Sequence, residues 1–192
     1  YRLVKTLGAG GMGTVFQAYS IAQKDHTVAV KVLRDELSRR ESNRRRFKLE
    51  GTIIDKLDHP NVIKIFERGE YHGKLFIVME FVEGITLAEI IETRDKLPLN
   101  QCLDIMKQVT SALVFIHRAN IIHRDLKPEN IMVSGDKENG FRVKLLDFGL
   151  SKMKFQSRIT MTGMMVGTAS YMAPEQLTDL ESSPASDVFS MG

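Results

Sequence analysis

The first eighty residues contain short runs of β-branched and aromatic side chains, a pattern that predicts strands. Strands are expected at 1–7, 14–19, 27–33, 62–66 and 75–79. A helix is expected at 42–57, because Phe47, Ile54 and Leu57 recur at helical spacing and would share one face. This part of the chain therefore predicts a small antiparallel sheet with one helix.

The pattern changes to helical periodicity after residue 84. Helices are predicted at 86–92, at 99–118 and from 186 onward, with a hairpin of two short strands at 131–133 and 142–146. Apolar residues at steps of three and four mark the buried face of the long helix, at Leu103, Met106, Val109, Leu113 and Ile116. Together the two parts predict an α+β chain with a sheet-containing first part and a mainly helical second part.

A glycine-rich segment, residues 8–13, separates the first two predicted strands. Its glycines allow backbone amides to approach phosphate groups closely. The spacing G-x-G-x-x-G also occurs in dinucleotide-binding folds, but those require a helix directly afterwards. Residues 14–19 are β-branched and aromatic, so this segment is predicted to join two strands.

A polar octapeptide, residues 123–130, lies between two apolar runs and predicts a loop held by buried segments. Within it, Asp125 can accept a proton, Lys127 can neutralise phosphate charge and Asn130 offers a neutral oxygen to a hard cation. Asp147 follows at the end of a further apolar run. Two carboxylates, an amide and a lysine are the groups that metal-assisted phosphoryl transfer requires. A salt-bridged turn is the alternative interpretation.

Two charged residues fall within otherwise apolar patterns. Lys31 lies in the predicted strand 27–33, and Glu50 lies in the apolar stripe of the predicted helix 42–57. A buried charge is costly unless it is paired, so the two are predicted to form an ion pair. Alternatively, Lys31 extends to solvent from an edge strand and Glu50 borders the stripe.

The composition of the chain restricts the class of protein and the partners that can be expected. The 192 residues are 43% apolar with a formal charge of +3, which fits one soluble globular domain and gives no reason to expect nucleic acid as a partner. The single cysteine, Cys102, excludes an internal disulfide and agrees with a reducing compartment. No membrane-spanning segment or secretory pattern is expected in this chain. A basic run at 39–46 predicts a solvated face, or alternatively a docking site for an acidic or phosphorylated segment.

These motifs, in this order, resemble the catalytic domain of eukaryotic-like serine/threonine protein kinases of bacterial type. The octapeptide 123–130 resembles the catalytic loop, 147–149 the Asp-Phe-Gly motif and 167–175 the substrate-docking segment. The resemblance implies a two-lobed kinase fold. Residues 1–83 would form the N-lobe and hinge, and residues 84–192 an incomplete C-lobe that ends where its central helix begins.

The resemblance also implies roles for individual residues. The catalytic residues would be Asp125, Lys127, Lys31 and Glu50, and the ligands of Mg²⁺, or alternatively Mn²⁺, would be Asn130 and Asp147. ATP would contact Leu7, Gly8, Gly10, Gly13, Val15, Ala29, Lys31, Met79, Glu80, Val82 and Met132. Thr160 and Thr162 would be activation-loop phosphosites whose phosphate pairs with Arg124, and Thr168 would belong to the substrate-docking segment and bond Asp125 and Lys127.

The expectation is therefore an ATP-dependent kinase that phosphorylates serine and threonine in protein substrates and autophosphorylates its activation loop, with two copies pairing for the reaction in trans. It would act in the cytoplasm or on the cytoplasmic face of a membrane. A nucleotide-binding pseudokinase or scaffold is one alternative, against which the chain contains Lys31, Glu50, Asp125, Asn130 and Asp147. An inactive truncated fragment is the other, because the resembled fold continues past Gly192.

Overall fold

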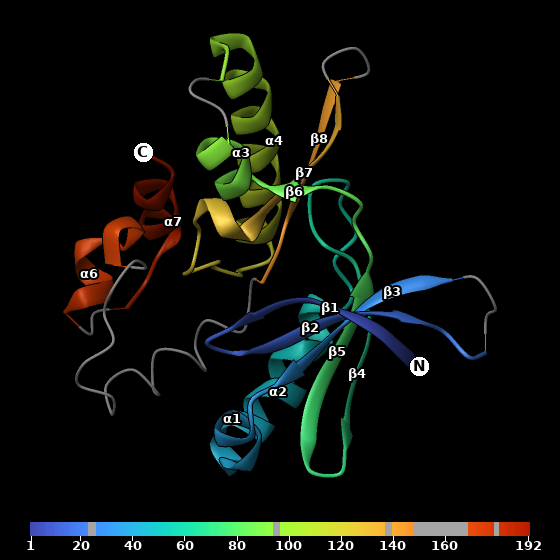
Figure 1. The fold of residues 1–192 in the computed structure, drawn as a ribbon. Coiled ribbons are helices and arrows are strands. Elements are labelled where there is room, and N and C mark those ends of the chain that lie inside the picture. The colour runs from blue at the N-terminus through green and yellow to red at the C-terminus, as the bar shows by residue number, and fades with distance from the viewer. Residues whose placement is uncertain (23–25, 94–96, 137–139, 148–168, 179–180) are drawn as a thin grey trace. The chain divides into compact units, whose positions relative to one another are not determined.

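The computed structural model describes residues 1–22, 26–93, 97–136, 140–147, 169–178 and 181–192 (Figure 1). Among these residues, one compact unit holds 1–58 and 64–81, and a second holds 59–63 and 82–192.

The first unit is built on a five-stranded sheet in the order β1-β2-β3-β5-β4, with every neighbouring pair antiparallel. Its strands are β1 (Arg2–Gly10), β2 (Gly13–Tyr19), β3 (Thr27–Leu33), β4 (Ile65–Tyr71) and β5 (Lys74–Glu80). The predicted antiparallel sheet is therefore confirmed. The fourth strand starts later than predicted, because the backbone of Val62 and Ile63 pairs with Leu145 in the second unit instead.

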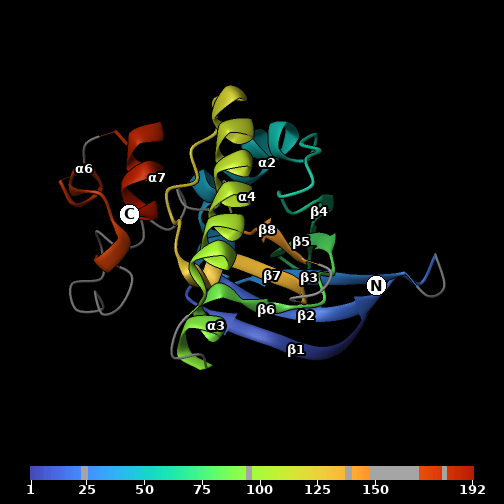
Figure 2. The same cartoon turned by 90° about the horizontal axis from the view of Figure 1, so that it is seen from above.

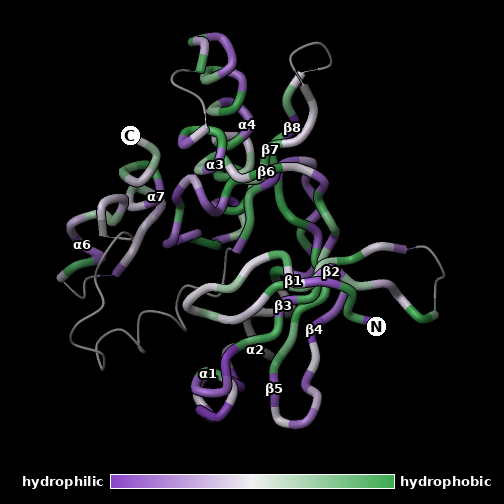
Figure 3. The backbone as a smooth tube through the Cα atoms, in the orientation of Figure 1, coloured by the Kyte–Doolittle hydropathy of each residue, from purple (hydrophilic) through white to green (hydrophobic). Residues whose placement is uncertain are grey.

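The strand register sorts side chains onto two faces of this sheet. Ala18, Val28, Val30 and Val78 are buried together in a hydrophobic core cluster. Residues directly opposite one another in an antiparallel pair share a face, and successive residues alternate between faces. Figure 3 shows the hydrophobic character of β5 along much of its length. The opposite face carries Lys31, whose neighbours across the sheet are Val15 and Ile77.

Two helices follow β3, namely α1 (Asp35–Arg39) and α2 (Glu41–Ile54). The predicted helix is confirmed, although it ends at Ile54 rather than at residue 57. Arg68 of β4 ties α2 to the sheet, since its Nε lies 2.6 Å from Asp55 Oδ1 and its guanidinium lies 5.4 Å from the centre of the Phe47 ring. Phe47 and Ile54 are both buried, as their spacing predicted.

The glycine-rich segment forms a hairpin, since β1 runs through Gly10 and β2 begins at Gly13. A Cβ atom on Gly13 would lie 2.1 Å from the carbonyl oxygen of Val32. A Cβ atom on Gly8 or Gly10 would meet nothing within 4 Å. The packing of the sheet therefore explains Gly13, whereas the described residues leave room for a side chain at Gly8 and Gly10.

This difference predicts different effects on stability. Gly13→Ala should lower the free energy of unfolding by about 1–3 kcal/mol, because β3 must move away from the new methyl group. Gly10→Ala is the matched control and should change it by about 0.5 kcal/mol or less. Urea denaturation of the full-length protein measures both. Equal effects from the two substitutions would contradict the close approach of β2 and β3.

The second unit contains a three-stranded antiparallel sheet in the order β6-β7-β8 and several helices (Figures 1 and 2). The strands are β6 (Ile85–Thr86), β7 (Ile131–Asp136) and β8 (Gly140–Leu145). The helices are α3 (Leu87–Thr93), α4 (Leu99–Arg118), α6 (Pro174–Leu177) and α7 (Pro184–Met191), with 3-10 turns η1 (Pro128–Asn130) and η2 (Ala169–Tyr171). The predicted bounds of α4 are confirmed.

The buried face of α4 differs from the predicted stripe. Val109, Leu113 and Ile116 are buried as expected, but Leu103 is 52% exposed. Hydrogen bonds of Gln108 explain why a different side of α4 is buried. Its Nε2 donates to the carbonyl oxygen of Phe141 at 2.8 Å, and its Oε1 accepts from the amide of Val143 at 3.0 Å. These bonds turn the Gln108 side of α4 toward β8, which moves Leu103 outward. Predicted residue Met106 is only half-buried, and Ile105 and Ala112 are buried instead.

Within the described segments, no helix has both the length and the apolar character needed to cross a bilayer.

Candidate active site

The polar octapeptide forms a loop in the second unit that is anchored by the imidazole of His123. This side chain is fully buried. Its Nδ1 accepts a hydrogen bond from the amide of Asp125 at 3.3 Å, so the ring hydrogen lies on Nε2, which donates to the carbonyl oxygen of Leu146 at 2.8 Å. Burial lowers the pKa of His123, against the opposing effect of the nearby carboxylates. A neutral imidazole therefore connects the loop to the end of β8.

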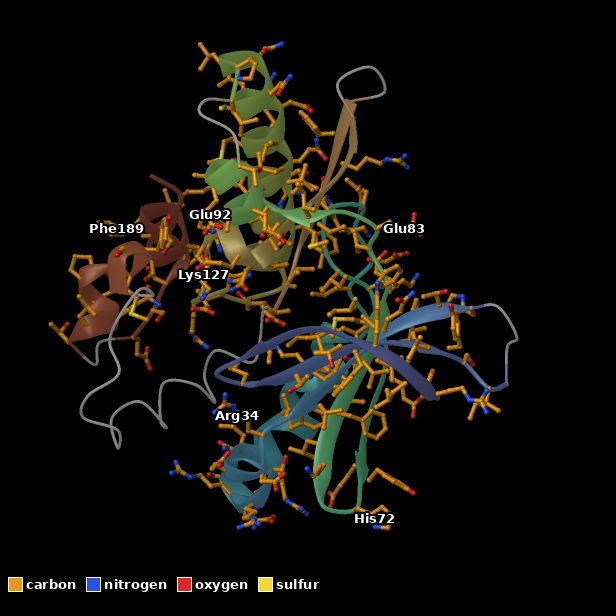
Figure 4. The ribbon with its side chains drawn as sticks, in the orientation of Figure 1. Arg34, His72, Glu83, Glu92, Lys127 and Phe189 are labelled. Carbon is orange, nitrogen blue, oxygen red and sulfur yellow. The ribbon has the colours of Figure 1, made fainter. Side chains whose placement is uncertain are left out.

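Asn130 orients the carboxylate of Asp125. The Nδ2 group of Asn130 donates to the backbone oxygen of Asp125 at 2.6 Å and to its Oδ2 at 3.1 Å. The amide of Asn130 in turn donates to the carbonyl oxygen of Lys127 at 2.9 Å, which closes the turn η1. Lys127, which is labelled in Figure 4, is half-buried and has an extended backbone directly before η1. Three of the predicted site residues therefore lie in one hydrogen-bonded loop.

The hairpin of β7 and β8 brings Asp147 beside this loop. Ile131 pairs with Leu145, and the amide of Leu146 donates to the carbonyl oxygen of Asn130 at 2.8 Å. The predicted proximity of Asn130 and Asp147 along the hairpin is thus confirmed. Asp147 adopts a φ of +58°, a conformation that costs a non-glycine residue about 1–3 kcal/mol and tends to occur at functional sites.

The chemistry of these two side chains fits a hard divalent cation. The nitrogen of the Asn130 amide is engaged by Asp125, so its oxygen faces the other way. Asp147 contributes a carboxylate one residue beyond the backbone bond to Asn130. Mg²⁺ is typically bound by one or two such oxygen ligands together with water and substrate phosphates.

Asp187 is a further residue of this site, and sequence reasoning missed it. Its side chain is 1% exposed. Oδ2 accepts from the amide of His123 at 2.8 Å and contacts His117 Nε2 at 2.7 Å, and Oδ1 accepts from the amide of Arg124 at 2.8 Å. Because Asp187 lies more than sixty residues from the loop, no local spacing in the sequence could have indicated this contact. Only its place in the first turn of a predicted helix was visible.

The neutral state of His123 predicts a pH dependence of stability. The folded-state pKa lies below the unfolded value of about 6.5, so the unfolded chain binds more protons below that pH. This contribution to stability is fully present above pH 6.5. It should be lost as pH falls toward the folded-state pKa, by at most about 1.4 kcal/mol per pH unit.

His123→Gln is the matched comparison, because glutamine offers both an acceptor and a donor but does not titrate. Urea denaturation of both proteins from pH 7.5 to 5.5 should show a smaller loss of stability in the variant. The substitution leaves the other four histidines in place, so the comparison isolates His123. Parallel pH profiles would contradict a neutral, buried His123.

Four of the predicted nucleotide-contacting residues lie on one face of the first unit's sheet. Val15 is directly opposite Lys31, and Ala29 is directly opposite Met79. Lys31 is 4% exposed, so its predicted burial is confirmed. The side chain of Glu50 lies outside the part of the chain that the structure describes, and the ion pair stays a prediction.

The structure gives less information about the other residues that were predicted to contact the nucleotide or the substrate. The amide of Glu80 donates to the carbonyl oxygen of Lys64 at 2.9 Å, so any backbone contact that Glu80 offers a nucleotide would come from its carbonyl group. Leu7 is exposed in β1, Val82 is half-buried after β5, and Met132 is half-buried in β7. Thr160, Thr162 and Thr168 lie outside the described residues, as does the glycine of the Asp-Phe-Gly motif, and their roles stay predictions.

Comparisons with known proteins agree with this geometry. The sequence profile of the family described as "Protein kinase domain" matches residues 1–192. The chain is 40% identical to the serine/threonine-protein kinase PknA of Corynebacterium glutamicum and 35% identical to PrkC of Bacillus subtilis. Both matches cover all of this chain, but only 41% and 29% of those proteins. The fold is similar to a crystal structure of the PknI kinase domain of Mycobacterium tuberculosis, solved as a double mutant, with a TM-score of 0.80 and 28% identity. This match covers 98% of the present chain and 70% of the PknI chain.

Proposed function

Because the chain belongs to the protein kinase domain family, we propose that it forms the catalytic part of an enzyme that transfers the γ-phosphoryl group of ATP to serine and threonine side chains of proteins. The observation that carries this proposal is the contact between Asn130 and Asp125. The amide nitrogen of Asn130 orients the Asp125 carboxylate, while its oxygen faces away from that carboxylate, in the loop that precedes β7. The family assignment supports the same activity.

In this proposal Asp125 orients the acceptor hydroxyl of the substrate and takes its proton. The bond from the acceptor oxygen to the γ-phosphorus forms while the bond from that phosphorus to the bridging oxygen of ADP breaks. Lys127 stabilises the negative charge on the transferring group. Placement and electrostatics supply most of the rate enhancement in such a reaction, which needs no covalent intermediate on the protein.

The remaining site residues bind the nucleotide. Asn130 and Asp147 would hold Mg²⁺ or Mn²⁺, which neutralises phosphate charge when bound. Lys31, aligned by Glu50, would contact the α- and β-phosphates under the glycine-rich hairpin. Adenine and the phosphates would contact Leu7, Gly8, Gly10, Gly13, Val15, Ala29, Met79, Glu80, Val82 and Met132. The shared sheet face of Val15, Ala29, Lys31 and Met79 supports this assignment.

Regulation is part of the same proposal. Thr160 and Thr162 would be phosphorylated in the activation loop, with two copies of the protein reacting in trans, and Arg124 would pair with the phosphate. Thr168 would help to dock the substrate. The names of the relatives support serine and threonine as acceptors. The cytoplasm, or the cytoplasmic face of a membrane, would supply ATP and protein substrates.

Incubation of the full-length protein with labelled ATP and Mg²⁺ tests the proposal. Autophosphorylation should appear, and mass spectrometry should locate phosphate on serine or threonine. Binding of nucleotide without any transfer would favour a pseudokinase and contradict the proposal. Phosphate confined to tyrosine would contradict the choice of acceptor. Activity in the full-length protein but not in residues 1–192 would show that this piece alone is an incomplete enzyme.

A further inference from the structure

We infer that Gln176 is a positioning residue for Asp125, because its side-chain amide holds the peptide group that joins Arg124 to Asp125. Gln176 belongs to α6, which begins within the predicted substrate-docking segment 167–175, and its side chain is 5% exposed. Its Nε2 donates to the carbonyl oxygen of Arg124 at 2.9 Å. The inference rests on the proposed function, in which Asp125 accepts the proton.

Both ends of the Gln176 amide are used. Its Oε1 accepts from the backbone amide of Ala173 at 3.1 Å, which caps the start of α6, while its Nε2 reaches the catalytic loop. The two bonds fix the orientation of the amide, since a flipped side chain would place a donor against the amide of Ala173 and an acceptor against the carbonyl of Arg124. Gln176 thus connects the start of α6 to the residue directly before Asp125.

The peptide group that Gln176 contacts is held in an unfavourable conformation. Arg124 has a φ of +65°, which costs a non-glycine residue about 1–3 kcal/mol and persists only where surrounding contacts fix it. Those contacts come from several directions. Asp187 Oδ1 accepts from the amide of Arg124, His123 Nδ1 accepts from the amide of Asp125, and Gln176 donates to the carbonyl between them.

The carbonyl of Arg124 and the amide of Asp125 belong to the same planar peptide group, so a rotation of one rotates the other. Without the Gln176 donor, the Arg124 carbonyl would lose its partner on α6, and the remaining contacts would hold this peptide group less firmly in its strained conformation. A rotation of this group would move the Cα of Asp125 and its carboxylate. A displacement of about 1 Å at a catalytic group lowers turnover by about 100-fold.

A purely structural role is the competing explanation, in which Gln176 only caps α6 through Ala173. Two substitutions separate the explanations. Gln176→Glu keeps an oxygen acceptor for the amide of Ala173 but removes the N–H donor to Arg124. Gln176→Met is close in size and removes both bonds. Thr178→Ala is the matched control, because this exposed residue of the same segment bonds only Pro174 and Glu175 among the described residues.

The experiment is steady-state kinetics of the full-length protein with ATP and a protein or peptide acceptor, together with thermal unfolding of each variant. Both Gln176 variants should lose about tenfold or more in kcat, with the KM for ATP within about twofold of wild type and with cooperative unfolding retained. Thr178→Ala should match wild type in all three quantities.

Wild-type kcat in Gln176→Glu would overturn the inference, because the cap alone would then explain the residue. Loss of cooperative unfolding in both variants, in proportion to the loss of kcat, would overturn it as well. Absence of phosphoryl transfer in the wild-type protein would instead refute the proposed function itself, so the two failures are distinguishable.

Discussion

Replacement of Asp125 by asparagine is expected to lower kcat by about 100- to 10,000-fold, the range over which a general base contributes. Asparagine has nearly the same shape and keeps an oxygen that can accept from the Asn130 amide, so the loop should keep its conformation. It cannot take a proton from the acceptor hydroxyl. Affinity for ATP should remain near wild type, because the residues proposed to contact the nucleotide are unchanged.

Glu129→Gln is the matched control for this experiment, because Glu129 is an exposed carboxylate of the same loop. It removes one negative charge from the same region and should leave kcat near wild type. Transfer rates with labelled ATP and nucleotide binding by calorimetry measure the two effects separately. An Asp125→Asn enzyme that turns over at a near-normal rate would refute the assignment of Asp125 as the base.

Asp187→Ala should lower the free energy of unfolding by about 2–5 kcal/mol, because it removes a buried carboxylate that accepts from two backbone amides and contacts His117. The substitution leaves the amides of His123 and Arg124 without their carboxylate acceptor, and an unsatisfied buried donor costs about 1–3 kcal/mol. Activity should fall as well, since both amides belong to the loop that carries Asp125.

Val188→Ala, at the adjacent exposed position of α7, should change stability by only about 0.5 kcal/mol. Asp187→Asn should lie between the alanine variant and wild type, because one oxygen still accepts while the other is replaced by a donor. Urea denaturation at pH 7.5 compares the three variants. If Asp187→Ala were as stable as Val188→Ala, the carboxylate would not be holding the loop.

Much of the first unit could be predicted because its signals are local. Apolar runs with β-branched residues placed the strands, and helical spacing placed α2 and α4. The residues after Gly13 distinguished a hairpin from the strand–helix turn of a dinucleotide fold. The polar loop was also visible, since a cluster such as 123–130 between apolar runs has few other interpretations.

What could not be predicted depends on contacts between segments far apart in the sequence. Periodicity shows that α4 has an apolar face but not which side meets β8, so the hydrogen bonds of Gln108 decided the exposure of Leu103. Asp187 and Gln176 reach the catalytic loop from across the second unit. Gln176 directly follows the motif 167–175, but nothing in the sequence indicates that its side chain contacts Arg124, and Asp187 is an ordinary polar residue of a short helix.

The proposed function requires that Lys31 of the first unit and Asp147 of the second bind the same metal-bound triphosphate. A crystal structure of the kinase domain with a non-hydrolysable ATP analogue and Mn²⁺, with the metal located by anomalous scattering, tests it most directly. The metal should lie about 2 Å from the amide oxygen of Asn130 and from the carboxylate of Asp147, with the Lys31 ammonium on the phosphate oxygens. A metal bound away from these two residues, or a Lys31 side chain directed into solvent, would contradict the account.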